Sequence, residues 1–299
     1  MPILSFTPDK LTALLDFAES GSSWGEPGRD LGRKIFEQTL SQPGLDLLSH
    51  CFLLEEGETV RGYCLVHHEG PINRMVLEPK VAHQFEGTSS EQELILRALS
   101  RAEEHGPGVV HICVQIPSPA ASFLTELGFA TVRSYDDMVW DHEDLPSNDI
   151  PEGFTVRSFN PGDAALLTEV QNSAFAASWG FCPNTVEQIE YRSSMANTFH
   201  QGICFLFDGA KAAGYCWTCL EPLNGSIRGV IGMIGVVPDY RGKGISRSIL
   251  IAGMESLRTQ NVADIGLQVD SSNTPGVRLY SSIGFEKVGE LNWLERRLV

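Results

Sequence analysis

Glycine and basic residues cluster in the sequence Arg241-Gly242-Lys243-Gly244, which we call the glycine loop. Over residues 245–257, apolar side chains recur about every four positions, which predicts a helix that begins directly after this loop. Gly242 and Gly244 allow the main chain to approach a ligand closely, and the first N–H groups of a helix have no partner within it. With the charges of Arg241, Lys243 and Arg247, these amides favour an anion such as a pyrophosphate.

The glycine loop differs from two familiar phosphate-binding loops. It lacks the spacing of a Rossmann G-x-G-x-x-G, and no Lys-Ser or Lys-Thr pair follows its last glycine, as a Walker A loop requires. Residues 232–250 instead resemble motif A of the GNAT acyl-CoA N-acyltransferases, in which Arg/Gln-x-x-Gly-x-Gly/Ala binds the pyrophosphate of coenzyme A. The match covers Arg241, Gly242, Lys243, Gly244, Ile245 and Ser246. Because the family usually has Gly or Ala in place of Ser246, we expect this serine to weaken or shift the phosphate packing without loss of binding.

A second segment agrees with this resemblance. Residues 269–285 are similar to GNAT motif B, with an Asn, a Leu-Tyr pair and a Gly-Phe pair in the family's order. The resemblance implies that Asn273 faces the pantetheine arm of the coenzyme and that the Tyr280 hydroxyl lies near its sulfur. Arg278 belongs to the same coenzyme-binding segment. The residues also fit a plain helix that starts at Asn273 and buries Tyr280, but the two motifs together favour the functional interpretation.

Acyl transfer from a thioester to an amine needs a deprotonated amine, stabilisation of the developing oxyanion and a proton for the thiolate. The resemblance implies that the strand before the glycine loop splays from its neighbour, so that the backbone of Ile234, Gly235 and Val236 meets the coenzyme. An N–H near Val236 would then contact the acyl carbonyl. We predict that Tyr280 donates a proton to the sulfur, since a free tyrosine pKa of about 10 is close to that of an alkyl thiol.

The general base and the acceptor pocket are less defined by the sequence. In the mycothiol synthase type of GNAT a glutamate begins the motif A strand, whereas Val230 occupies that place here. Glu221, at the end of the preceding strand, is the nearest candidate base, and its alternatives are a solvated surface charge or a water relay. Trp179 and Phe181 lie in a loop that either lines the acceptor pocket or packs between domains.

The two halves of the chain repeat the same order of expected strands and helices. Residues 60–64 match 212–216, and residues 126–129 match 282–285, while the polar stretch 141–152 fits a linker. We therefore expect an α/β (α+β) fold of two tandem GNAT-like domains, 1–145 and 151–299, each a mixed, mostly antiparallel sheet with helices on both faces. The first domain has no glycine loop and has Leu124 in place of Tyr280, so it resembles a degenerate copy. The whole chain is similar to the mycothiol synthase type of two-domain GNAT.

Composition excludes several other classes. The 299 residues carry a net charge of −16, and residues 1–150 hold 24 Asp and Glu against 10 Lys and Arg, which disfavours a nucleic-acid partner. No apolar run approaches the roughly 18 residues of a membrane helix, and the first residues do not fit an export signal. Seven scattered cysteines indicate a reducing compartment, so we expect a cytoplasmic protein. We expect no metal site.

Two further patterns fit catalytic motifs only superficially. Cys216 and Cys219 have the spacing of a redox pair, but they lie in an expected strand, where residues three apart point to opposite faces. Residues 21–25 fit the serine hydrolase pattern G-x-S-x-G, but they follow a helical pattern and are better explained as its end.

The resemblance thus implies an N-acetyltransferase that uses acetyl-CoA to acylate the amine of a small molecule. A non-catalytic sensor or scaffold that binds coenzyme A is the alternative, because Val230 replaces the family's glutamate. The acceptor and the oligomeric state stay open.

Overall fold

The computed structural model describes residues 1–20, 29–106, 108–223 and 225–298. These residues form two compact units. The N-terminal unit contains residues 1–20, 39–135 and 289–298, and the C-terminal unit contains residues 29–38 and 136–288. The G-x-S-x-G pattern at residues 21–25 lies outside the described residues. No helix in the described part of the chain combines the length and apolar character needed to cross a membrane.

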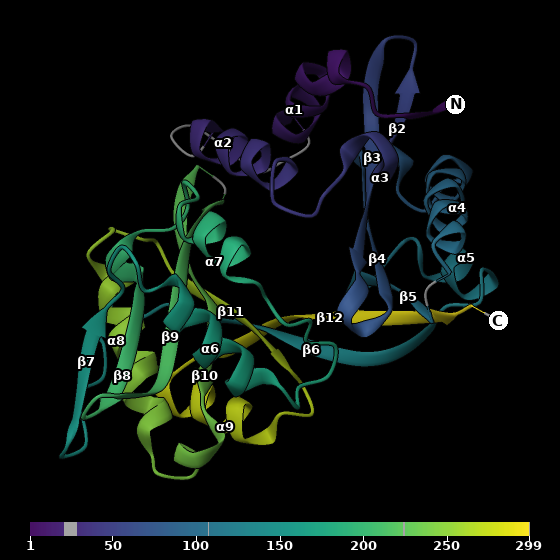
Figure 1. Cartoon of the computed structure of the whole chain (residues 1–299). Helices are drawn as coiled ribbons and strands as arrows, with labels where there is room; N and C mark the ends of the chain where they lie inside the picture. The colour runs from purple at the N-terminus through teal and green to yellow at the C-terminus, as the bar shows by residue number, and fades with distance from the viewer. Residues whose placement is uncertain (21–28, 107, 224, 299) are drawn as a thin grey trace. The chain divides into compact units, whose positions relative to one another are not determined.

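The N-terminal unit contains a mixed sheet with the strand order β1-β2-β3-β4-β5-β12 (Figure 1). Only β4 and β5 pair in parallel, and the other registers are antiparallel. The strands are β1 (Ile3–Ser5), β2 (Cys51–Glu56), β3 (Thr59–Glu69), β4 (Arg74–Val81), β5 (Val109–Ile116) and β12 (Glu286–Arg297).

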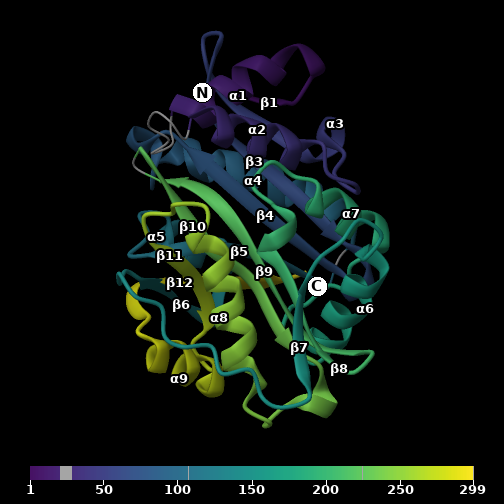
Figure 2. The same ribbon diagram turned by 90° about the vertical axis from the view of Figure 1, so that its left-hand side faces the viewer.

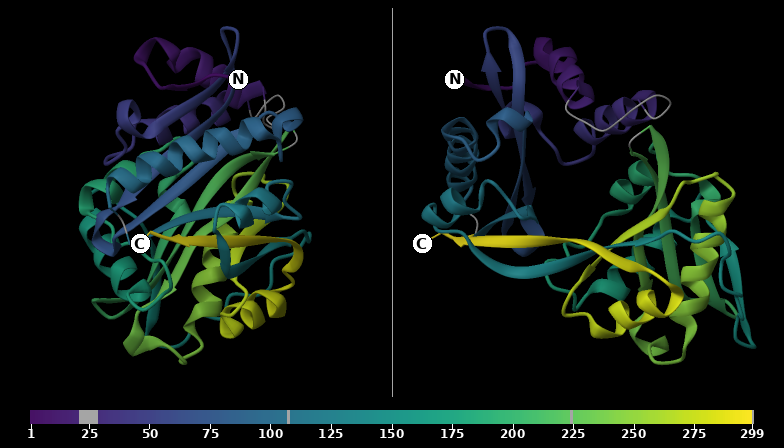
Figure 3. Two further views of the ribbon diagram at one scale, coloured as in Figure 1. Left: turned by 90° about the vertical axis from the view of Figure 1, so that its right-hand side faces the viewer. Right: turned by 180° about the vertical axis from the view of Figure 1, so that it is seen from behind.

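Helices cover both faces of this sheet. On one face, α4 (Ser89–Glu104) packs along β2, β3 and β4 and buries Leu94, Ile95 and Ala98 in the core (Figure 3). On the other face, α1 (Leu11–Ser20) packs on β3, with Phe17 edge-on to Tyr63. The remaining helical segments are η1 (Pro8–Lys10), α3 (Leu47–His50), η2 (Gly70–Ile72), η3 (His83–Phe85) and α5 (Ala121–Glu126).

The C-terminal unit has the strand order β6-β11-β10-β9-β8-β7. The pairs β7–β8, β8–β9 and β9–β10 are antiparallel, and β10–β11 is parallel. The strands are β6 (Ala130–Trp140), β7 (Phe154–Ser158), β8 (Ile203–Asp208), β9 (Lys211–Leu223), β10 (Ser226–Val236) and β11 (Ile265–Asp270).

Two separate apolar cores lie on the two faces of this second sheet. One forms with α8 (Ile245–Arg258) and α9 (Thr274–Ile283), and α8 can be followed across the strands in Figure 2. The other forms with α6 (Ala164–Phe175) and α7 (Val186–Ser193), which begins at a capping box of Thr185 and Gln188. Two short 3₁₀ helices, η4 (His200–Gly202) and η5 (Pro238–Tyr240), complete the unit.

One helix from the first part of the chain belongs to the C-terminal unit. The Tyr191 hydroxyl donates to the Gln38 carbonyl at 2.6 Å, and the Ala196 N–H donates to Gln38 Oε1 at 2.8 Å. Gln38 lies on α2 (Arg29–Leu40). These bonds hold the end of α2 beside α7.

The strands β6 and β12 each contribute to both units. Residues 290–297 of β12 pair with β5, and Leu294 is buried in the N-terminal core. Met138 and Trp140 of β6 are buried in the C-terminal core. The mixed α/β fold with helices on both faces is confirmed, but the compact units are not continuous ranges. The limits 1–145 and 151–299 of the two tandem domains remain a prediction, because the packing of β6 and β12 in both units does not show where each repeated domain begins and ends in the sequence.

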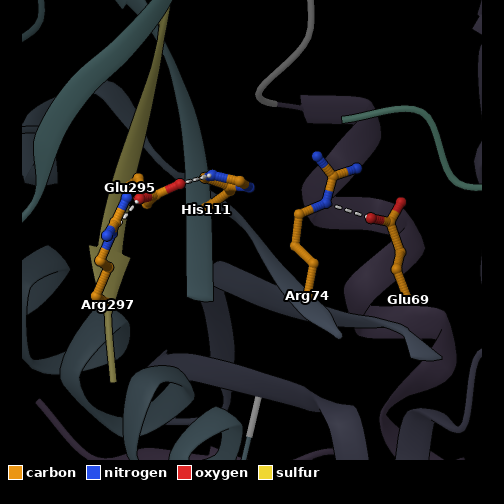
Figure 4. A network of polar contacts seen from close by, with 5 residues as sticks. All are labelled: Glu69, Arg74, His111, Glu295 and Arg297. Atoms are coloured by element: carbon orange, nitrogen blue, oxygen red, sulfur yellow. Dashed lines mark hydrogen bonds and ion pairs between the residues drawn. The ribbon is translucent and has the colours of Figure 1, made fainter. Parts of the chain in front are cut away.

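Polar contacts hold the end of β12 in the N-terminal unit (Figure 4). Glu295 accepts hydrogen bonds from His111 Nε2 at 3.1 Å and from Arg297 Nε at 3.0 Å, and nearby Arg74 donates to Glu69. Burial lowers the pKa of His111, against the opposing effect of Glu295. Burial alone would raise the pKa of Glu295, but hydrogen bonds from Arg297 and His111 lower it. The carboxylate is therefore the favoured form of Glu295 in the folded unit.

Candidate functional site

The strands β10 and β11 part soon after they meet. Their parallel pairing consists of Gly229 with Ile265 and Val230 with Gly266. A bulge follows between Ile231 and Met233, and from there to Val236 β10 is paired only with β9. The backbone of β10 on the side of β11 therefore has no ladder partner after the bulge, which agrees with the predicted splay.

The register with β9 fixes which amides face the parting. Val237 N–H donates to the Ala213 carbonyl of β9 at 3.0 Å. Because successive residues of a strand direct their N–H groups to opposite sides, the N–H groups of Val236 and Ile234 point away from β9. The amide of Gly235 points toward β9 instead. Ile234 and Val236, two of the three residues predicted to contact the coenzyme through their backbone, therefore direct their N–H groups to the side where β10 has no partner strand.

Gly235 has a different role, because its lack of a side chain allows α6 to pack closely against the sheet. A Cβ atom at this position would lie 2.8 Å from Ala174 Cβ and 2.9 Å from Phe175 Cε2. Both contacts are closer than real side chains allow, so any larger residue would displace α6 from β10.

The glycine loop leaves the start of α8 without a side-chain cap. Gly242 and Gly244 have φ angles of 75° and 79°, which only glycine adopts without strain. Nothing lies within 4 Å of a Cβ built on either glycine, and Gly244 is the N-cap of α8 with no capping side chain. Open space and unpartnered helix-start amides are the features that suit an anion.

The basic residues near the loop differ in what they contact. Arg241 Nη2 donates to the Ala174 carbonyl at 2.6 Å and its Nε donates to the Val236 carbonyl at 3.2 Å, so this guanidinium ties the loop to α6 and β10. Lys243 is exposed, with its Nζ 4.5 Å from the centre of the Tyr240 ring. Arg247 is partly buried on the first turn of α8. The Ile245 side chain is buried in the core, and Ser246 is partly buried.

The predicted motif B residues lie on α9. Asn273 is its N-cap and accepts a hydrogen bond from Gly276 N–H at 3.1 Å, as the plain-helix interpretation expected. Arg278 is exposed. Tyr280 is 8% exposed, and its burial, with a smaller effect of Cys216, raises its pKa well above the ordinary value. The hydroxyl is therefore a firmly protonated donor, and proton transfer from it to a thiolate is uphill rather than balanced.

The candidate base, Glu221, lies on the α6 side of the C-terminal sheet, opposite to α8 and α9. Alternate residues of β9 point to the α6 side, and we call Tyr215, Trp217, Cys219 and Glu221 the acceptor face. Cys216 is buried on the α8 side, so the predicted opposite orientation of Cys216 and Cys219 is confirmed. Burial raises the pKa of the Cys219 thiol to about 12, which makes it a poor nucleophile.

Glu221 lies on this face beside the position where the family has glutamate. Val230 pairs with Cys219, so Glu221 is its diagonal neighbour on the same face. The Glu221 residue reaches solvent, yet desolvation of its carboxyl raises its pKa. Arg228 opposes this rise, but it also bonds both carboxylate oxygens of Asp264, at 2.6 and 2.7 Å. A carboxyl with a raised pKa at this place suits a general base.

The loop between α6 and α7 contains both predicted acceptor residues. Phe181 stacks on Phe175 with 5.5 Å between ring centres, and Phe175 lies edge-on to Tyr215 at 6.5 Å. Trp179 is partly buried in the same loop. Asn172 closes the loop through two 2.9 Å hydrogen bonds with the backbone of Asn184. Through Phe175, Phe181 is therefore in ring contact with the acceptor face.

The corresponding loop of the N-terminal unit is closed by its own carboxylate. Gly87, with a φ of 70°, precedes α4 and donates its N–H to Glu91 Oε2 at 2.6 Å. Glu91 is 8% exposed, and burial raises its pKa. Sequence reasoning missed this contact, although a Glu four residues after a glycine at a helix start was a usable signal. The amide that an anion would use here is already bonded.

Comparisons with known proteins find relatives over most of the chain. Residues 165–285 match the family model described as Acetyltransferase (GNAT) family. The chain is 30% identical over 215 residues to a mycothiol acetyltransferase of Thermomonospora curvata, covering 69% of each chain. It is 28% identical over 298 residues to the mycothiol acetyltransferase of Thermobispora bispora, covering 94% of each.

Solved structures show the same fold over nearly the whole chain. A GCN5-related N-acetyltransferase from Sphaerobacter thermophilus is similar with a TM-score of 0.73 and 20% identity, covering 99% of this chain and 95% of that one. A tandem GNAT protein from the clavulanic acid biosynthesis pathway has a TM-score of 0.70 and 17% identity, covering 99% and 97%.

Proposed function

Because the chain belongs to the GNAT acetyltransferase family, we propose that its C-terminal unit transfers the acetyl group of acetyl-CoA to the amine of a small molecule. The observation that carries this proposal is the separation of β10 from β11, followed after η5 by a glycine loop with no side-chain cap. Members of the family use acetyl-CoA, and both features fit that coenzyme.

The coenzyme would lie along the parted strand, with its pyrophosphate at the start of α8. The open space at Gly242 and Gly244 fits the phosphates, and Lys243 and Arg247 supply positive charge. The side chain of Arg241 holds the glycine loop against α6. The backbone N–H groups of the loop are then the groups that would bind the anion. Ile245, Ser246, Asn273 and Arg278 complete the proposed coenzyme contacts. When bound, the coenzyme supplies a thioester whose carbonyl carbon an amine can attack.

The residues of this chain then have three tasks. The N–H groups of Ile234 and Val236 hydrogen-bond the acyl oxygen as negative charge develops on it. Glu221 accepts a proton from the ammonium form of the acceptor, directly or through water, so that the neutral amine can attack, and its raised pKa makes it a stronger base for this step. Tyr280 donates a hydrogen bond to the sulfur and releases its proton only as the thiolate leaves.

The acceptor is a small-molecule amine, and Trp179 and Phe181 are proposed to line its entry. The name shared by the relatives from Thermobispora bispora and Thermomonospora curvata makes a mycothiol-type amine the first acceptor to test. Val230 stands in place of the glutamate expected for that type, so we propose that Glu221 takes over the role of base.

The second candidate, a sensor that binds coenzyme A without turnover, is favoured by the apolar Val230 alone. A panel of amines with acetyl-CoA and detection of free thiol separates the two. Thiol release that depends on the amine supports the acetyltransferase. Saturable binding of acetyl-CoA, without thiol release for any amine, supports the sensor.

A further inference from the structure

Arg228 lies directly opposite the candidate base on the neighbouring strand. In the antiparallel pair of β9 and β10, Arg228 is the register partner of Glu221, so both side chains leave the same face of the sheet. Opposite charges in this position attract, and a direct ion pair would hold the pKa of the carboxyl low and weaken it as a base. Within the described residues, no hydrogen bond or ion pair joins these two side chains, because the guanidinium is bound elsewhere.

The guanidinium of Arg228 is turned toward β11, where it binds Asp264. Its Nε donates to Asp264 Oδ1 at 2.6 Å, and its Nη2 donates to Oδ2 at 2.7 Å. A Cβ built on Gly266 of β11 would lie only 3.2 Å from Arg228 Cδ. The absence of a side chain at Gly266 therefore leaves the space that the arginine occupies on its way to Asp264.

The carboxylate that holds Arg228 has a fixed place beside the sheet. Asp264 directly precedes β11, and its carbonyl accepts a hydrogen bond from Gly229 N–H at 2.9 Å. A guanidinium bound through two parallel N–H groups is fixed in its plane as well as in its distance. Arg228 cannot turn to a second carboxylate without breaking one of these bonds.

A third carboxyl, Asp137 of β6, belongs to the same group. Met138 and Trp140 are buried on the α8 side, so Asp137, which alternates with them along the strand, points to the α6 side. Burial raises the pKa of Asp137, against the opposing effect of Arg228. Burial is also the largest effect on Glu221, whose pKa Asp137 raises further. One guanidinium thus acts on three carboxyls, which come from β6, the start of β11 and β9.

The other groups that face Glu221 carry little charge. Its neighbour on the same face of β9 is Cys219, whose thiol is kept neutral by burial. The exposed His200 of η4 stacks on Phe159 with 6.0 Å between ring centres. The buried side chains of α6 are not titratable, and they are Ala164, Leu167, Thr168, Val170, Gln171 and Ala174. The charges that act on Glu221 are those of Arg228 and Asp137.

We propose that Arg228 is a positioning residue for the base Glu221, and that Asp264 holds its guanidinium far enough from Glu221 for this carboxylate to take up a proton from the acceptor. This inference rests on the proposed acetyltransferase function and deepens it, because it names the two residues that set the strength of the base. Asp264 acts through Arg228, and Arg228 acts through Glu221.

The experiment is an NMR titration of the Glu221 side-chain carboxyl in protein that contains ¹³C-labelled glutamate. The signal is assigned by its loss in Glu221→Gln, and no acceptor is needed. Asp264→Asn keeps the shape of the side chain and removes its charge, so Arg228 is free to approach Glu221. The carboxyl should then titrate at least about half a pH unit lower than in the wild type. An unchanged or higher value in Asp264→Asn would overturn the proposal.

Arg228→Gln should move the titration in the opposite direction. This change removes the cation of the group, so the carboxyl of Glu221 should titrate about one pH unit higher than in the wild type. An ion pair that only stabilised the fold would not produce opposite shifts in Arg228→Gln and Asp264→Asn. An unchanged value in a folded Arg228→Gln variant refutes the role of Arg228, and Asp264→Asn alone decides if Arg228→Gln does not fold.

Asp163→Asn is the matched control in the same unit. Arg157 binds both carboxylate oxygens of Asp163, at 2.6 and 3.3 Å, as Arg228 does those of Asp264. Asp163→Asn should lower the Tm about as much as Asp264→Asn and leave the Glu221 titration unchanged. If it shifts that titration as far as Asp264→Asn does, the specific effect of Asp264 is refuted.

The pH–rate profile separates this inference from the proposed function. The acid limb of kcat/KM, measured with the amine of the panel that releases thiol fastest, should shift with the NMR value in each variant. A limb that stays in place while the NMR value moves would refute the role of Arg228 in the reaction. If no amine releases thiol, the proposed function fails, and the NMR shifts still decide whether Asp264 and Arg228 control the proton affinity of Glu221.

Discussion

Replacement of Gly244 by alanine tests the anion site without removing any side chain. The φ angle of 79° forces an L-residue into the left-handed region, while the space around the Cβ is open, so strain is the only local cost. That strain is about 1–2 kcal/mol, which lowers the Tm by about 2–8 °C for a unit of this size. If the loop relaxes to relieve it, an N–H is turned from the phosphate. One charge-assisted hydrogen bond is worth about 1.5–3 kcal/mol, so the Kd for coenzyme A should rise about 10- to 100-fold.

Gly209 provides the control. It lies in the turn between β8 and β9 with a φ of 56° and nothing within 4 Å of a Cβ. Gly209→Ala should lower the Tm of the same unit by a similar amount and leave the Kd unchanged. Calorimetric titration with coenzyme A, and with pantetheine, which lacks the pyrophosphate, separates the effects. Gly244→Ala should not weaken pantetheine binding. If Gly244→Ala binds coenzyme A as tightly as Gly209→Ala does, the reasoning about the loop is refuted.

Three other outcomes follow from the same structure. Tyr280→Phe should lower kcat by about 10²- to 10⁴-fold with little change in the KM for acetyl-CoA, and steady-state rates that match the wild type would remove Tyr280 from the reaction. Glu221 must be deprotonated to act as a base, and desolvation raises its pKa, so kcat/KM for the amine should fall as pH drops through that raised value. Glu221→Gln should abolish this acid limb, and a pH–rate profile that keeps the limb would exclude Glu221. The buried His111 has a lowered pKa, so the fold prefers the neutral ring and the unfolded chain binds more protons below about pH 6.5. The Tm of the protein should therefore fall between about pH 7.5 and pH 5.5, and a Tm that rises over this range would contradict the sign.

The sequence predicted the tandem fold, and the comparison with solved structures confirms it. It also predicted a helix directly after the glycine loop, and α8 begins there. The position of the loop depends on a local signal, namely glycines before an amphipathic helix. The pairing of β12 with β5 could not be predicted from the sequence, because the alternation of side chains along a strand does not specify which strand it pairs with. Pairing with β5 depends on partners far away in the chain, such as His111 for Glu295.

The contacts and pKa values of individual side chains could also be predicted only in part from the sequence. The charge of Arg241 was expected to face the anion, but its guanidinium bonds two carbonyls that only the folded chain brings near it. The tyrosine at position 280 was expected to keep an ordinary pKa, and the depth of its burial changes this. The sequence also did not indicate that Gln171 Oε1 and Trp217 Nε1 are buried without a hydrogen-bond partner among the described residues, because apolar spacing predicts burial and not the absence of partners.

A crystal structure of the acetyl-CoA complex tests the central claim most directly. We expect the pyrophosphate on the amides at the start of α8, and the thioester oxygen about 2.9 Å from the N–H of Ile234 or Val236. A coenzyme bound at Gly87 in the N-terminal unit, or a thioester that does not reach β10, would contradict it.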